Sequence, residues 1–71
     1  MQQNDICKKF GERVKKLREA KNLSLNMLAY ENDINKSTLS RIENGLVDPK
    51  LSTIHKIAEG LEMSIDELMK F

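Results

Sequence analysis

The chain has 71 residues, one cysteine and a formal net charge of +1. This length predicts a single domain over residues 1–71, the lone cysteine excludes an internal disulfide, and no His/Cys cluster in the sequence suggests a structural metal. The sequence begins at Met1 without a long apolar run, so we expect a complete cytoplasmic protein with neither a signal peptide nor a membrane span.

Basic charge is concentrated near the N-terminus. Residues 1–22 hold seven Lys or Arg against three Asp or Glu, whereas residues 23–71 hold five against eight. This polarity is expected if one side of the protein faces phosphates, although a solvated lysine-rich helix would show it too. Charge alone therefore leaves both interpretations open.

The first predicted helix spans about residues 5–21. Phe10, Val14 and Leu17 recur at helical spacing and so share one face. The charged residues that point mainly away from that face are Lys8, Lys9, Glu12, Arg13, Lys15 and Lys16. Asn22 is expected to end the helix, because asparagine accepts the left-handed backbone conformation that follows many helices.

Two shorter helices are predicted next, over about residues 25–32 and 36–44. Ser24 and Asn35 are suited to cap them, because their side-chain oxygens can accept hydrogen bonds from free backbone N–H groups. Asp33 tolerates a turn conformation between the two helices. The first of these helices carries the apolar residues Leu25, Leu28 and Ala29, and the second is expected to turn Leu39 and Ile42 inward.

Gly45 is expected to end the third helix, and a loop leads to a fourth helix over about residues 51–61. The buried positions of that helix are expected to be Leu51, Ile54, Ile57, Ala58 and Leu61. Ser64 and Glu67 form a capping box, in which each side chain satisfies the backbone of the other, and open a short fifth helix over residues 65–70. The sequence therefore predicts an all-α protein, a compact five-helix bundle.

The most informative stretch runs from Ser24 to Gly45. Two short helices are separated by about four residues there, and the second is capped by a small polar residue, which is the spacing of a helix-turn-helix. In such a motif the first helix lies across the DNA backbone and the second lays its N-terminal turn in the major groove. The exposed face expected for the second helix consists of Lys36, Ser37, Ser40, Arg41 and Asn44. That face is entirely polar and includes two cations, although most polar helix faces simply meet solvent.

A longer set of residues resembles a known family. Leu28-Ala29, the run from Ile34 to Gly45, and Pro49 closely resemble the Cro/repressor (Xre-type) helix-turn-helix family. The likeness continues through Phe10-Gly11-Glu12-Arg13, Leu17-Arg18-Glu19, Leu51, Thr53, Ile54, Ile57-Ala58-Glu59 and Ile65-Asp66-Glu67-Leu68, and covers about residues 9–69. The resemblance implies a lambda-repressor-like DNA-binding domain. It also implies a sequence-specific transcriptional regulator of bacterial or phage type that binds double-stranded DNA.

The resemblance assigns roles to individual residues. Lys36, Ser37 and Arg41 match positions that usually contact base edges, with Ser40 and Thr38 as further candidates. Arginine suits guanine, because O6 and N7 of that base accept its two-pronged set of donors. Phosphate contacts are implied for Ser24, Thr38, Asn44 and Lys50. These contacts would give affinity and register without reading sequence.

Arg18 and Glu43 match a partly buried salt bridge that fixes the first helix against the end of the recognition helix. Three positions depart from the family pattern. Leu25 stands where a glutamine usually donates to a phosphate, and Asp33 stands where glycine is favoured, so we expect weaker non-specific affinity. Met27 replaces a usually polar residue. Leu25 and Met27 are expected either to form an exposed apolar spot for a partner or to be scattered surface hydrophobes.

The resemblance also implies a homodimer on a pseudo-palindromic operator, with two recognition helices roughly 34 Å apart in successive major grooves. We expect its interface at Ile65, Leu68, Met69 and Phe71, the alternative being ordinary packing against the fourth helix. A repressor or autoregulator is the favoured role. The alternative is an antitoxin or other protein-interaction module on the same fold, favoured by the apolar spot and the near-neutral charge. Besides DNA and a second copy, a toxin or RNA polymerase is a candidate protein partner.

No catalytic or cofactor motif is recognisable in the sequence. It contains no Ser/His/Asp or Cys/His arrangement in a plausible context, no phosphate loop and no metal motif. His55 is expected at the surface, and Cys7 is expected to be structural or incidental. Tyr30 is aligned with an outward position of the second helix, where it either touches a phosphate or is idle. We therefore expect neither an enzyme nor a cofactor.

Overall fold

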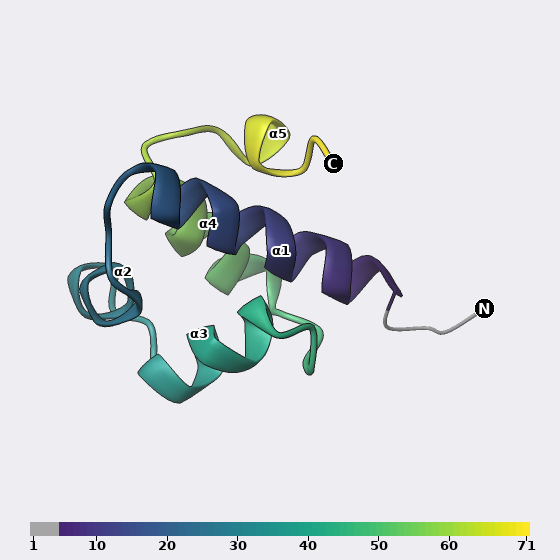
Figure 1. The fold of residues 1–71 in the computed structure, drawn as a ribbon, viewed down its shortest axis with the longest axis horizontal. Helices are drawn as coiled ribbons and strands as arrows, with labels where there is room; N and C mark the ends of the chain where they lie inside the picture. The colour runs from purple at the N-terminus through teal and green to yellow at the C-terminus, as the bar shows by residue number, and fades with distance from the viewer. Residues whose placement is uncertain (1–4) are drawn as a thin grey trace.

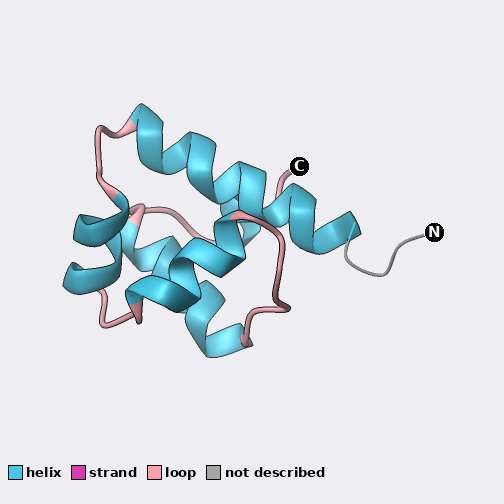
Figure 2. Ribbon diagram, turned by 60° about the horizontal axis from the view of Figure 1, so that its bottom comes forward, coloured by secondary structure: helices cyan, strands magenta, loops and turns pink. Residues whose placement is uncertain are grey.

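The computed structural model describes residues 5–71, so the first four residues of the predicted domain lie outside the described part. Its helices are α1 (Asp5–Ala20), α2 (Leu25–Glu31), α3 (Lys36–Glu43), α4 (Leu51–Gly60) and α5 (Ile65–Leu68). Each helix begins at the predicted residue and ends within two residues of the predicted end. Residues 5–71 contain no strand (Figure 2). The predicted all-α fold of five helices is confirmed.

The starts of α2 and α3 are set by the two predicted caps. Ser24 Oγ accepts a hydrogen bond from the backbone N–H of Met27 at 3.0 Å. Asn35 Oδ1 accepts from Ser37 N at 2.9 Å and from Thr38 N at 3.3 Å. Each contact satisfies a donor that the helix itself leaves unpaired, which is worth about 1 kcal/mol per cap.

Left-handed residues end the helices and shape the turns. Asn22 (φ 58°), Asp33 (φ 55°) and Gly45 (φ 70°) adopt this conformation at the positions the sequence predicted. Glu62 (φ 59°) after α4 adopts it as well and was not anticipated. Three of these four turns are thus made by residues with a Cβ, of which Asn and Asp accept the conformation most readily.

The predicted capping box at α5 is only half formed. Ser64 Oγ accepts from Glu67 N at 3.1 Å. The Glu67 carboxylate turns instead to Lys70, whose Nζ lies 3.6 Å from Oε1. The N-terminus of α5 therefore relies on the serine hydroxyl.

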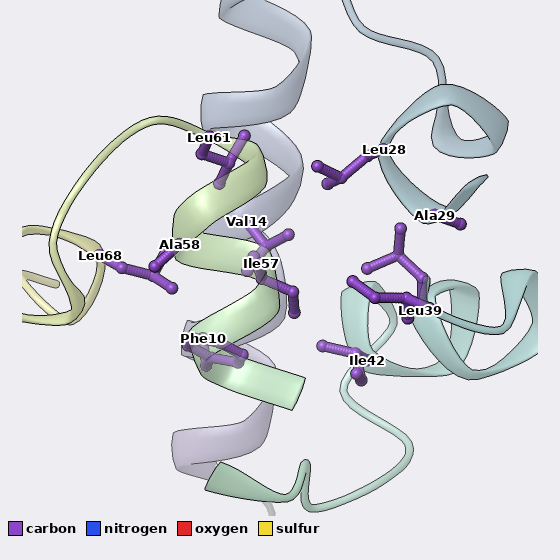
Figure 3. Close-up of a cluster of buried hydrophobic side chains, with 11 residues drawn as sticks. Phe10, Val14, Leu28, Ala29, Leu39, Ile42, Ile57, Ala58, Leu61 and Leu68 are labelled. Atoms are coloured by element: carbon purple, nitrogen blue, oxygen red, sulfur yellow. The ribbon is translucent and has the colours of Figure 1, made fainter. Parts of the chain in front are cut away.

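A single apolar cluster draws on all five helices and fills the space between them (Figure 3). Its members are Phe10, Val14, Leu28, Ala29, Ile34, Leu39, Ile42, Ile57, Ala58, Leu61 and Leu68. Burial of each large aliphatic side chain contributes roughly 1.5–3 kcal/mol. Removal of this apolar surface from water is therefore the main force that holds the short helices together.

One residue expected inside lies outside. The side chain of Leu51 is 72% exposed, so its place in the predicted buried positions of α4 is wrong. Leu51 is the first residue of that helix. Because helix side chains lean toward the N-terminus, this one leans past the end of α4 into solvent.

The helix α1 runs between α3 and α5, which lie on opposite sides of it (Figure 1). Its approach to α3 is close at Gly11, where a Cβ would clash with the carbonyl oxygen of Ile42 and lie 2.7 Å from that of Glu43. On the other side, Arg13 Nη2 donates to Glu67 O at 2.7 Å and Nε to Leu68 O at 3.2 Å. Arg13, expected to point away from the protein, thus ties α5 to α1.

No helix in the described part of the chain combines the length and apolar character needed to cross a membrane.

Candidate nucleic-acid interface

The inner side of α3 is fixed by a pair of charges. Arg18 Nε lies 2.7 Å from Glu43 Oε2, and Arg18 Nη2 donates to Glu43 Oε1 at 3.0 Å. Arg18 Nη1 also donates to Leu23 O at 2.8 Å. The two side chains are only 11% and 6% exposed. The structure therefore brings together the pair expected from the sequence, and the two parallel hydrogen bonds fix the relative orientation of α1 and α3.

The environment of Arg18 favours its charged form. The hydrogen bonds to Glu43 raise the pKa of Arg18 and outweigh the opposing effect of burial. A base whose pKa is raised by folding contributes stability at every pH below its unfolded value and loses it only as the pH rises through the folded value. For an arginine that window is strongly alkaline, so no pH dependence is expected from Arg18 near neutrality.

The outer side of α3 is polar and largely open. Lys36, Ser37, Arg41 and Asn44 are exposed, and Ser40 and Thr38 are half-buried. Within residues 5–71, neither Lys36 nor Arg41 has a carboxylate within 4 Å. Both cations are therefore available to an external acceptor.

Three of the residues expected at phosphates keep a donor for an outside acceptor. Ser24 caps α2, and its hydroxyl keeps its own proton to donate because it acts as an acceptor toward Met27. Lys50 is exposed at the start of α4 and makes no side-chain capping hydrogen bond there. Asn44 Nδ2 donates one hydrogen to Ser40 O at 2.9 Å, which leaves its second amide hydrogen for another acceptor.

The turn between α2 and α3 is held by a residue that the sequence analysis missed. Lys56 Nζ on α4 donates to the backbone oxygen of Asp33 at 3.2 Å. The same ammonium lies 3.9 Å from Asp33 Oδ2. It therefore offsets the anion that Asp33 introduces next to α3. Lys56 and Asp33 are 23 residues apart in the chain, and periodicity gives no indication that they meet.

An open hollow of about 320 Å³ lies between α3 and the start of α4. Thr38 and Arg41 line it from α3, and Lys50 and Thr53 line it from the start of α4. Asp33 and Asp48 also line it, so its charge is mixed. A shallow concavity with several donors suits a ligand that presents both acceptors and donors at its edge, as DNA does in the major groove.

The apolar spot expected on α2 is smaller than the sequence suggested. Leu25 is half-buried and packs against the core, whereas Met27 is 44% exposed. Tyr30, one turn after Met27, is 88% exposed. The exposed apolar surface of α2 therefore consists of Met27 and the Tyr30 ring.

The four residues of the expected dimer interface have different surroundings. Leu68 is fully buried in the core of its own chain, and Ile65 is half-buried against that core. Met69 and Phe71 are 38% and 48% exposed. The centroid of the Phe71 ring lies 6.3 Å from the centroid of the Phe10 ring, and the two ring planes make an angle of 54°. Leu68 thus follows the packing alternative and offers no surface to a second copy.

The remaining single residues show no site of their own. His55 is exposed, with Nε2 3.4 Å from Glu59 Oε2. Cys7 is buried and unpaired. Within residues 5–71, no three His, Cys, Asp or Glu side chains are grouped so that they could hold a metal ion.

Comparison with known proteins places this arrangement in a family. A helix-turn-helix family model, HTH_3, matches residues 14–68. The HTH-type transcriptional repressor RghR of Bacillus subtilis (strain 168) is 43% identical over 61 residues, which are 84% of this chain and 45% of RghR. The control protein C.MunI of Mycoplasma sp is 39% identical over 66 residues, which are 92% of this chain and 89% of C.MunI.

The fold has a close counterpart among solved structures. The restriction-modification controller protein C.AhdI from Aeromonas hydrophila superposes with a TM-score of 0.84 and 35% sequence identity. The match covers 87% of this chain and 94% of that one. The chain thus spans less than half of RghR but nearly the whole of the controller proteins. It belongs to the HTH_3 (Xre/Cro-C1-type) helix-turn-helix family, a family of non-enzymatic DNA-binding transcriptional regulators of bacteria.

Proposed function

We propose that this protein is a sequence-specific transcriptional regulator that binds double-stranded DNA through α3 and acts as a repressor or autoregulator. One observation carries the proposal: the two sides of α3 are built differently. Arg18 and Glu43 fix the inner side, while Lys36 and Arg41 on the outer side have no carboxylate within 4 Å in the described part of the chain. A helix held this way presents its polar face rigidly, as base reading requires.

The proposed reading surface starts at the N-terminus of α3. Lys36 and Ser37 lie in its first turn, and Arg41 follows about one turn later on the same exposed face. Arg41 suits a guanine, whose O6 and N7 accept both of its donors, and Lys36 can donate to the same atoms. Thr38 lines the hollow beside α4 together with Arg41, and the half-buried Ser40 is the further candidate for a base contact.

Backbone contacts would hold the protein in register on the duplex. Ser24 at the start of α2, Asn44 at the end of α3 and Lys50 at the start of α4 each retain a donor for such contacts. Thr38 borders the hollow beside α3, where its hydroxyl can donate as well. Such contacts contribute affinity that falls with salt, and they carry no sequence information.

The length of the relatives supports a compact regulator of the controller type. The control protein C.MunI and the controller C.AhdI match this chain over nearly their whole length. RghR carries a further part that this chain does not match. The part of the chain proposed to bind DNA is therefore the part that these two controllers share with it.

We propose a homodimer on a pseudo-palindromic operator, with the interface at the C-terminal end of the fold. Met69 and Phe71 are its exposed members, with the outer part of Ile65 beside them. Ile6, 60% exposed, lines a small hollow together with Met69. Apolar side chains gathered at one end of so small a protein are more stable when a partner covers them.

The dimer is tested by sedimentation equilibrium of wild type and Phe71→Asp. We expect the charge to weaken dimerisation by at least tenfold, because a carboxylate would be buried without a partner. Leu46→Asp, at a residue 70% exposed in the loop after α3, is the control and should dimerise like wild type. A monomeric wild type at high concentration would refute the dimer.

Selection from a pool of random duplex DNA tests the function itself. At moderate salt, wild type should enrich one pseudo-palindromic sequence, and Arg41→Ala should enrich a different one or none. Lys70→Ala is the control for lost charge, because Lys70 pairs with Glu67 at α5, across α1 from α3 (Figure 1). If wild type enriches no sequence even at low salt, the proposed function is wrong.

A protein-interaction role, such as that of an antitoxin, is the second candidate. It is favoured by the exposed side chains of Met27 and Tyr30 on α2. Under this alternative, Met27→Asp should abolish a complex with a toxin or RNA polymerase while Arg41→Ala has no effect. If DNA is the target, Arg41→Ala should weaken DNA binding more than Met27→Asp does.

A further inference from the structure

The turn between α2 and α3 decides how α3 is presented, and few local contacts hold it. Its backbone hydrogen bonds are those from Ile34 N to Ala29 O at 2.9 Å, from Asn32 N to Tyr30 O, and a long one from Asp33 N to Tyr30 O at 3.5 Å. Asp33 occupies the left-handed region without being glycine, at φ 55°. A residue in that region is retained when surrounding contacts over-determine it.

The missing support comes from α4. Lys56 Nζ donates to the backbone oxygen of Asp33 at 3.2 Å. Lys56 is half-buried, so its stem is packed while its ammonium reaches the turn. The Asp33 carboxylate, by contrast, is fully exposed and 3.9 Å from the same ammonium. Both contacts are solvent-exposed, but only the carbonyl oxygen lies within hydrogen-bond distance of the ammonium, and the carboxylate adds a weak, solvent-screened attraction.

A second contact reinforces the same connection between α4 and α2. Gly60 of α4 lies so close to the end of α2 that a Cβ would meet the side chains of Asn32 and Leu28. Asn32 Nδ2 in turn donates to Leu28 O at 2.9 Å. With α2 fixed to α4 at Gly60 and the turn fixed at Lys56, the start of α3 has little freedom to rotate.

We propose that Lys56 is a positioning residue of the DNA interface, which holds the carbonyl of Asp33 and thereby sets the orientation of α3 in the major groove. The proposal rests on the proposed DNA-binding function and adds to it a residue outside the helix-turn-helix. Lys56 borders the hollow next to α3. A direct contact with a phosphate is the rival interpretation, and the two make different predictions.

A positioning role affects discrimination more than general affinity. In Lys56→Met, binding to the selected duplex should fall about fivefold, the size of effect expected for the loss of one solvent-exposed hydrogen bond. Binding to unrelated duplex should change less than twofold, and the salt dependence should keep its slope. A phosphate contact would weaken both duplexes equally and lower the slope by about one unit. Equal weakening with a reduced slope overturns the proposal.

Two variants separate the carbonyl from the charge. Lys56→Arg keeps a cationic donor and should restore most of the discrimination. Asp33→Asn removes the carboxylate and keeps the backbone oxygen, so it should retain the discrimination and bind all duplexes somewhat more tightly, because one anion near DNA is gone. If Asp33→Asn loses discrimination as Lys56→Met does, the carboxylate rather than the carbonyl is the contact that matters, and the proposal is wrong.

Hydrogen exchange tests the contact without DNA. The amide of Ile34, bonded to Ala29 O, should exchange about fivefold faster in Lys56→Met than in wild type or Asp33→Asn. The amide of Leu61, bonded to Ile57 O in α4, is the control for a global loss of stability and should not change. If Ile34 exchange is unaltered, or if it rises without loss of discrimination, Lys56 does not position α3. If wild type selects no DNA, the proposed function fails, and Ile34 exchange still decides whether Lys56 holds the turn.

Discussion

Arg18 of α1 contacts α3 and Arg41 lies on α3, yet the first is buried and paired whereas the second is exposed. Arg18 is 11% exposed and makes three hydrogen bonds, two of them to Glu43. Arg41 is exposed and has no carboxylate within 4 Å among residues 5–71. The same type of side chain thus fixes structure at Arg18 and, at Arg41, is left open for the recognition role proposed above. This contrast predicts that their variants will fail in different assays.

The largest expected effect is on the inner side of α3. Glu43→Ala should lower the free energy of unfolding by about 3–5 kcal/mol, because it leaves the buried charge of Arg18 without its partner. Urea denaturation followed by circular dichroism measures this. The double variant Arg18→Met with Glu43→Leu should be more stable than Glu43→Ala, since it buries no unpaired charge. Equal stability of all these variants and wild type would contradict the role given to the pair.

The next effect concerns the close approach of α1 to α3. Gly11→Ala should cost about 1–3 kcal/mol, because the added methyl group meets backbone oxygens of Ile42 and Glu43 that cannot move away separately. Gly60→Ala is the matched comparison, since its methyl group meets the side chains of Asn32 and Leu28, which can shift. Thermal unfolding should therefore show a smaller loss for Gly60→Ala. A larger loss for Gly60→Ala than for Gly11→Ala would mean that α1 and α3 can separate to accommodate a methyl group at Gly11.

The third effect is on the outer side of α3 and concerns binding. Arg41→Ala should leave the free energy of unfolding within about 0.5 kcal/mol of wild type, because the side chain is exposed and has no carboxylate within 4 Å in the described part of the chain. It should weaken binding to the selected duplex by about 1–3 kcal/mol. Denaturation and fluorescence anisotropy on the same preparation measure both quantities. If Arg41→Ala were clearly less stable than wild type, Arg41 would have a structural role like that of Arg18, and the contrast between the two arginines would be wrong.

The smallest effect is expected at Lys50. Lys50→Ala should weaken binding to selected and unrelated duplexes alike, and it should reduce the slope of log affinity against log salt by about one unit. A titration at three salt concentrations measures the slope. A change in sequence preference instead would place Lys50 at a base edge.

Local features of this fold could be predicted from the sequence because they depend on near neighbours. Ser24 and Asn35 cap helices, and Asn22 and Asp33 turn left-handed, for reasons contained in a few adjacent residues. The five helices follow from the spacing of apolar residues in the same way. The pairing of Arg18 with Glu43 came from resemblance to a family and not from periodicity.

Contacts between distant elements could not be predicted. Lys56 meets Asp33 only because α4 crosses behind the turn, and Arg13 meets the end of α5 only because that helix folds back over α1. Helical spacing gives the buried face of each helix but not the angle at which two helices cross. Leu68 was assigned to a surface for the same reason, since its neighbours in the core lie far away in the chain.

The claim that the outer side of α3 reads sequence is tested most directly by a set of duplexes derived from the selected operator, each with one symmetric base-pair change. Wild type should lose about 1–3 kcal/mol of binding at each contacted position. Arg41→Ala should lose its discrimination at one position per half-site and keep it at the others. If Arg41→Ala instead bound every duplex in the set more weakly than wild type by the same factor, Arg41 would contact phosphate. That result would contradict the claim that the outer side of α3 reads sequence.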